Sequence, residues 1–317
     1  MRKKVKFNVQ HKVKLNNFSI TDFLFLISSL FTFFYFQLFT FYAPDTYVFV
    51  KYAAHHNLTR DLSIKSIISN NFIFDLLTVI GDKMNLSSGF DFLIFFVCVS
   101  AILFIIKYVF LLKLGKKRDV LLVLVGSFFA MDLNMFRYSL SIFILILILL
   151  NNKNKLIKLI LSFLSHLLPL IVVINRKLFY LPILFVIFFP LSYFFGQSRI
   201  FDYLLDTEMK FFKSFLFGIP FLFCFYKMKK SENFNYKLMK LGEGFLILGI
   251  IFIFLQPVLA ARFLETAFYL CLIANVYMPF NKFKRFVLFI FAFFAFVSRF
   301  IGGINAGSNS FISEFIL

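Results

Sequence analysis

The chain consists of long apolar runs separated by short polar clusters. Residues 22–42 and 90–112 are each long enough to cross a hydrocarbon core of about 30 Å as an α-helix, which rises about 1.5 Å per residue. Further runs cover residues 120–131, 156–174, 178–195, 215–226, 242–257, 266–278 and 286–301. The pattern predicts an all-α polytopic integral membrane protein with about 9–10 transmembrane or re-entrant helices.

The composition favours the same class. The chain is 61% hydrophobic, with 55 Phe, and its mean hydropathy is +0.88, which is far more apolar than a soluble protein of 317 residues. The net charge of +19 could suit nucleic acid, but the Lys and Arg residues lie in short clusters between apolar runs, as in cytoplasmic loops. We therefore expect the lipid bilayer, and no nucleic acid, as a partner.

The charge distribution also predicts an orientation and a single transmembrane domain over residues 1–317. Residues 1–17 form a basic tail, which we place in the cytoplasm, and the span that follows is too long for the core of a cleaved signal peptide. Residues 43–89 form the longest polar stretch and are expected to be an extracytoplasmic loop, whereas the basic residues 227–240 are expected inside.

The central region, residues 119–174, contains the most unusual polar positions. Basic clusters at residues 116–118 and 153–158 place both flanks in the cytoplasm, so residues 119–150 should form a hairpin with its outer tip near residues 132–137. Its first arm, residues 120–131, reaches only roughly 18 Å, which favours a recessed polar tip. Residues 156–174 should form a re-entrant pair that bends near Pro169.

Polar side chains within these apolar runs are candidates for function. An ionised group near a bilayer centre costs on the order of 2.5–3.5 kcal/mol, so Asp132 and Arg137 at the tip are costly to retain. Arg137 is the harder of the two to neutralise, because a guanidinium keeps its proton in proteins. His166 is a third candidate, because it lies alone in an apolar run.

Each candidate also has a purely structural interpretation. Arg137 could extend from a helix end to the lipid headgroups, and His166 could be hydrogen-bonded within the bundle. Arg262 and Glu265, three positions apart, could form a pair on a helix surface, and Asp45 could lie in a helix N-cap region.

Four short motifs, taken together, resemble the EpsG-type family of exopolysaccharide synthesis, which is similar in kind to Wzy-type O-antigen and capsule polymerases. The motifs are Pro44-Asp45-Thr46-Tyr47, Asn134-Met135-Phe136-Arg137, Phe163 to His166, and Arg262-Phe263 followed by Tyr269. Family members often have Gln-x-x-Arg-Gln and a direct Phe-His pair, where this chain has Asn-Met-Phe-Arg-Tyr and Leu-Ser-His.

The resemblance implies a polymerase in the bacterial cell (inner) membrane that joins undecaprenyl-pyrophosphate-linked oligosaccharides at the extracytoplasmic face. Arg137 and Arg262 would stabilise the departing pyrophosphate, and His166 or Asp45 would accept the proton of the attacking hydroxyl. The residues expected to bind substrate are Tyr47, Asn134, Tyr138 and Glu265. We expect no metal and no cofactor, because no DxD-type motif is present and Cys98, Cys224 and Cys271 lie at no metal-ligand spacing.

Partners in the same pathway would be a flippase and a chain-length regulator. A competing prediction is that the chain is itself a flippase, because intramembrane Arg and His also mark substrate pathways in transporters. Transporters usually show two similar halves, and the sequence shows no such repeat. A third alternative is a non-catalytic scaffold of a polysaccharide assembly complex, in which Arg137 and His166 would tolerate substitution.

Overall fold

The computed structural model describes a helical bundle. The described residues are 19–40, 46, 49–50, 72–133, 136–150, 157–158, 160–162, 211–225, 234–252 and 257–307. Within these ranges every element is a helix, and no strand is present. The helices are α1 (Ile20–Tyr35), η1 (Phe36–Thr40), α4 (Phe72–Lys83), α5 (Gly89–Leu114), α6 (Lys117–Ser127), η2 (Phe128–Leu133), α7 (Phe136–Leu150), α12 (Phe211–Phe225), α13 (Phe234–Phe252), α14 (Pro257–Tyr277) and α15 (Lys282–Gly307).

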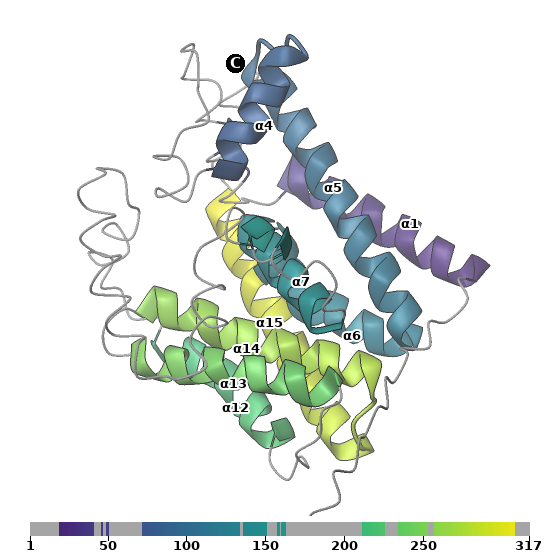
Figure 1. Cartoon of the computed structure of the whole chain (residues 1–317), viewed down its shortest axis with the longest axis vertical. Coiled ribbons are helices and arrows are strands. Elements are labelled where there is room, and N and C mark those ends of the chain that lie inside the picture. Colours follow the sequence, from purple (N-terminus) through teal and green to yellow (C-terminus); the bar gives the residue numbers. More distant parts are fainter. Residues whose placement is uncertain are drawn as a thin grey trace, which may run out of the picture.

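Local signals explain where α4 ends and α5 begins. Asn85 adopts a left-handed conformation with φ of 59°, the Leu86 N–H donates to the Gly81 carbonyl at 3.1 Å, and the helix therefore ends in a Schellman motif. Ser88 and Asp91 then form a capping box, in which each side chain accepts from the backbone N–H of the other. The two helices consequently form a tight hairpin (Figure 1).

Helix α14 is the centre of the bundle. Its buried positions extend from Ala260 to Val276, and it packs against α12, α13 and α6. Small residues on the neighbours allow this close approach, since a Cβ at Gly126 of α6 would lie 2.6 Å from Leu272 Cδ1. Helices α12, α13 and α14 form one layer, and α1 lies along α5 (Figure 1).

Several helix ends meet at one end of the bundle, around the buried carboxylate of Asp119. Arg285 Nη2 of α15 donates to Asp119 Oδ1 at 2.8 Å, and Asn275 Nδ2 of α14 donates to the same atom at 3.2 Å. Lys117 Nζ lies 3.3 Å from Asp22 Oδ1, which brings the start of α1 to the same place. We call this region the basic end, after its cations Lys117, Arg118, Lys282, Lys284 and Arg285.

Two predicted spans are confirmed as long apolar helices, and other elements differ from prediction. Ile20–Leu38 and Gly89–Leu114 are long and apolar enough to cross a membrane, a criterion of length and composition that a soluble core helix or a signal sequence also meets. The predicted loop of residues 43–89 contains α4, and α13 begins at Phe234, inside the predicted basic loop of residues 227–240. The predicted first arm, residues 120–131, is helical, and the helical backbone continues through Asp132 to Leu133.

Candidate functional site

Two deeply buried charges form an ion pair between α5 and η2. The Lys107 ammonium contacts the carboxylate of Asp132, and their side chains are only 2% and 3% exposed. Lys107 is seven positions before the end of α5, so the pair lies about 10 Å from that helix end, within the bundle. The side chain of Asp132, which the sequence analysis placed at a recessed polar tip, is enclosed by protein.

Three further side chains complete this ion-pair cluster. The Tyr108 hydroxyl donates to Asp132 Oδ2 at 2.8 Å, and the Ser127 hydroxyl lies 3.3 Å from the same oxygen. The Lys107 ammonium also lies 4.7 Å from the centre of the Tyr269 ring, a cation–π contact from α14. With three donors around the carboxylate and an aromatic face against the ammonium, both charges are compensated where water is excluded.

A π-helical turn directs Asp132 into the bundle. The turn η2 continues α6, and a second π-helical turn, η1, continues α1 beside it. Gln37 of η1 donates to the Leu133 carbonyl at 3.3 Å, and Thr46 donates to Gln37 Oε1 at 2.9 Å. Because π turns inside α-helices are rare and occur often at functional sites, two in contact mark this region as a candidate site.

Arg137, at the start of α7, lies buried beside this region. Its side chain packs on Phe74 of α4, with the guanidinium carbon 4.0 Å from the ring centre, and the residue is 7% exposed. This position excludes the interpretation in which Arg137 extends to the lipid headgroups. Enclosure of a permanent cation within the bundle is costly, which makes Arg137 a candidate for function.

Tyr138, the neighbour of Arg137, connects α7 to α14. Thr266 Oγ1 donates to the Arg262 carbonyl at 2.7 Å, so its one hydroxyl proton is used, and the Tyr138 hydroxyl must donate to Thr266 Oγ1, at 2.7 Å. The Tyr138 hydroxyl is also within electrostatic range of the Arg262 guanidinium. One hydrogen bond thus links the first turn of α7, which contains Arg137, to the turn of α14 that begins at Arg262.

Four polar residues of α14 lie on one face. Arg262, Glu265, Thr266 and Tyr269 follow the i, i+3, i+4, i+7 spacing that aligns side chains along a helix. Glu265 is 4% exposed, which excludes the interpretation of Arg262 and Glu265 as a pair on the protein surface. This face, the polar stripe of α14, connects the arginine region at Tyr138 with the ion-pair cluster at Tyr269.

Four of the predicted site residues are therefore brought to α7 and α14: Arg137, Tyr138, Arg262 and Glu265. The other four, Asp45, Tyr47, Asn134 and His166, lie outside the described residues. The sequence analysis did not assign Lys107, Tyr108 or Tyr269 to the site. Lys107 carried the clearest missed signal, because a lysine in a long apolar run requires a buried partner of opposite charge.

The site residues that are described offer donors and cations, which suit phosphate oxygens. In the part of the chain that the structure describes, no group of three or more His, Cys, Asp or Glu side chains could hold a metal ion. Compared with family models, with curated proteins and with solved structures, the chain matches no family, no curated protein and no known structure.

Proposed function

We propose that the chain is a polytopic membrane protein whose buried polar site acts on a lipid-linked, pyrophosphate-bearing oligosaccharide. Support for the membrane comes from α5, whose exposed positions include the large apolar side chains of Phe90, Ile94, Ile102 and Ile106. The same helix buries Lys107. A soluble helix would show the reverse arrangement, with charge outside and isoleucine inside.

The orientation follows from the basic end. Lys and Arg at the starts of α6 and α15 meet there, and such clusters are retained on the cytoplasmic side of bacterial membranes. The N-terminus, close to the start of α1, would then be cytoplasmic. The α4–α5 turn, at the other end of the 26-residue helix α5, would face the outside.

The reaction we propose is polysaccharide polymerisation in the cell membrane. The observation that carries this proposal is the enclosure of Arg137 in the bundle, next in sequence to Tyr138, whose hydroxyl is bonded to Thr266 in the turn of α14 that begins at Arg262. If both guanidinium groups reach one substrate, they match a pyrophosphate, because each fork binds two phosphate oxygens. A lipid pyrophosphate is the leaving group when repeat units are joined from a polyprenyl carrier.

The bond changes balance as follows. A hydroxyl oxygen of the acceptor saccharide attacks the anomeric carbon of the donor, the new glycosidic bond forms, and the bond from that carbon to the phosphate oxygen breaks. The electron pair of the broken bond stays on the pyrophosphate, where the arginines stabilise it. The hydroxyl proton passes to a base, and His166 and Asp45 are our candidates.

Transport of the same substrate is the second candidate, and the Lys107–Asp132 pair favours it. Intramembrane ion pairs line substrate pathways in transporters, and this pair is enclosed within the bundle. Both functions would use the same lipid-linked substrate, and only the polymerase changes its covalent structure.

Purified protein in liposomes that contain a lipid-linked repeat unit separates the two functions. A polymerase yields products of two or more repeat units together with free lipid pyrophosphate, whereas a flippase yields substrate that is unchanged but accessible from the other leaflet. We expect polymer. Transbilayer movement with no change in chain length would overturn the polymerase proposal in favour of the transporter.

A further inference from the structure

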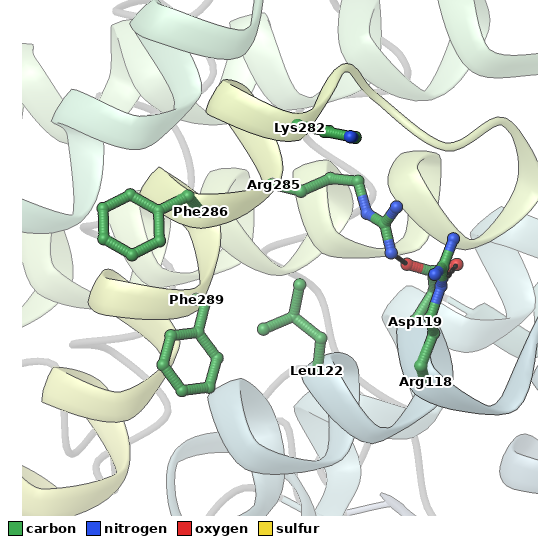
Figure 2. A pocket seen from close by; sticks show the side chains of 7 residues that line it. All are labelled: Arg118, Asp119, Leu122, Lys282, Arg285, Phe286 and Phe289. Carbon is green, nitrogen blue, oxygen red and sulfur yellow. Dashed lines mark hydrogen bonds and ion pairs between the residues drawn. The ribbon is translucent and has the colours of Figure 1, made fainter.

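A second polar feature of the bundle lies outside the polar stripe of α14. It is a surface pocket of about 310 Å³ at the basic end, between α6 and α15 (Figure 2). Its lining residues are Arg118, Asp119, Leu122, Lys282, Arg285, Phe286 and Phe289. Asp119 of this pocket accepts from Asn275, which follows Tyr269 of the ion-pair cluster by six positions, about 9 Å along the axis of α14.

The polar half of this pocket has excess positive charge. Asp119 is almost fully enclosed, at 1% side-chain exposure, and it binds Arg285 Nη2 at 2.8 Å (Figure 2). Arg118 lies further from the same carboxylate, with its Nε atom 3.8 Å from Asp119 Oδ2, and its side chain is 61% exposed. Together with the exposed Lys282, three cations surround one carboxylate, which leaves a net charge of about +2 for an anion.

The other half of the pocket is apolar and continues along α15. Phe286 and Phe289 line it at 59% and 54% exposure, and Phe293, 56% exposed, follows one turn later with its ring stacked on that of Phe289. From Lys282 to Phe293 the helix rises about 16 Å, close to the thickness of one leaflet of hydrocarbon. The cations therefore lie at one end of an exposed aromatic strip that is about as long as one leaflet is thick.

We propose that this pocket binds an anionic phospholipid of the cytoplasmic leaflet. The phosphate would be held by Arg118 and Lys282, with Arg285 fixed beneath it by Asp119, and an acyl chain would lie along Phe286, Phe289 and Phe293. A free phosphate fits the cations alone and leaves the aromatic strip uncovered, so the combination favours a lipid. The proposal rests on the membrane embedding proposed above and is independent of the reaction.

The absence of Trp from the sequence makes a direct test possible, because an introduced tryptophan is the sole indole fluorophore. A Phe289→Trp variant reports on the pocket, and a Phe31→Trp variant, on the exposed face of α1, reports on bulk lipid. Each is reconstituted with phosphatidylcholine or phosphatidylglycerol that carries bromine on its acyl chains. Bromine quenches a nearby tryptophan, so the quenching measures how often each lipid occupies that position.

We expect brominated phosphatidylglycerol to be preferred over phosphatidylcholine at least about fivefold at the Phe289→Trp reporter, and not at the Phe31→Trp reporter. Adding Arg118→Gln and Lys282→Gln should remove the preference while Asp119 and Arg285 keep their ion pair. The control pair Lys83→Gln and Lys237→Gln removes the same amount of positive charge from exposed sites outside the pocket. The preference for phosphatidylglycerol should persist in this control.

Equal quenching by both lipids at the Phe289→Trp reporter would overturn the lipid site, as would a preference that survives the Arg118 and Lys282 substitutions. Displacement of the lipid by millimolar inorganic phosphate would show a free-anion site and also contradict the proposal. If brominated lipid fails to quench even the Phe31→Trp reporter, the membrane embedding itself is wrong. The failure of the site and the failure of the embedding are thereby distinguished.

Discussion

At the scale of single residues, the Lys107–Asp132 pair explains how an apolar bundle tolerates charge. Each ion is compensated by the other and by Tyr108, Ser127 and Tyr269, so removal of one partner is much worse than removal of both. Asp132→Asn should therefore lower the free energy of unfolding in detergent by about 3–5 kcal/mol, because it leaves the Lys107 ammonium enclosed without a counter-charge.

The double variant Lys107→Met with Asp132→Leu provides the control for this prediction. Replacement of a buried ion pair by apolar side chains of similar volume is often close to neutral, so its stability should return to near that of the parent protein. If the pair serves only the fold, the double variant keeps activity. If it also serves the substrate, the double variant is stable and inactive. Equal destabilisation by the single and double substitutions would contradict the ion pair.

Individual site residues could be predicted from the sequence where a charged residue lies within an apolar run. Contacts between residues of two different runs were predicted less well. Arg137 and Arg262 were predicted as a converging pair; the structure links their helices through the Tyr138–Thr266 hydrogen bond, and the convergence of the two guanidinium groups stays a prediction. The partner of Asp132 was not predicted. The identity of this partner depends on how α5 crosses η2. A π-helical turn changes the direction in which the following side chains point, and no local sequence pattern predicts such a turn.

At the scale of elements, the two long apolar runs predicted their helices within a few residues, because an uninterrupted apolar stretch of that length has few alternatives. Helix α4 was missed because its twelve residues lie in a polar stretch and carry Asp75, Asp82 and Lys83. The beginning of α13 was placed too late for the same reason: Lys237 and Lys240 are exposed within the helix, where the sequence suggests a loop.

The junction between α5 and α6 offers an element-scale prediction. A Cβ at Gly115 would lie 2.2 Å from the backbone carbonyl oxygen of Val276, and a backbone atom cannot rotate away as a side chain can. Gly115→Ala should therefore displace the end of α14. Overpacking of this kind typically lowers the free energy of unfolding by about 1–3 kcal/mol, so the unfolding temperature should fall by several degrees.

Gly218→Ala is the matched control for that junction. Its added Cβ would lie 3.1 Å from Leu246 Cδ1, the end of a flexible side chain, and alanine also favours the helix that contains it. Thermal unfolding of both variants in detergent should separate them clearly. A Gly115→Ala protein as stable as Gly218→Ala would show that the two helix ends are not in close contact.

At the scale of the whole molecule, the two ends of α5 should lie on opposite sides of the membrane. Single cysteines are placed at Met84, in the turn before α5, and at Lys282, at the basic end, in a background from which Cys98, Cys224 and Cys271 have been removed. In intact cells a membrane-impermeant thiol reagent should label Met84→Cys alone, with Lys282→Cys labelled only after permeabilisation. Labelling of Lys282→Cys alone in intact cells would reverse the orientation.

The central claim is that Arg137 and Arg262 together hold a pyrophosphate as it leaves. Loss of one preorganised electrostatic contact of this kind typically costs about 10²–10³ in rate, and lysine keeps the charge but not the two-pronged geometry. Arg137→Ala and Arg262→Ala should therefore abolish most polymerisation, and the corresponding Lys variants should recover only part of it.

The most direct measurement is the rate of polymer formation by purified protein from a lipid-linked repeat unit, for Arg137→Ala, Arg137→Lys, Arg262→Ala and Arg262→Lys. Lys237→Ala, at an exposed cation of α13, is the control and should retain the full rate. The account predicts a loss of about 10²–10³ in both alanine variants and an intermediate rate in both lysine variants. Full activity in both lysine variants, or in either alanine variant, would place the pyrophosphate elsewhere and contradict it.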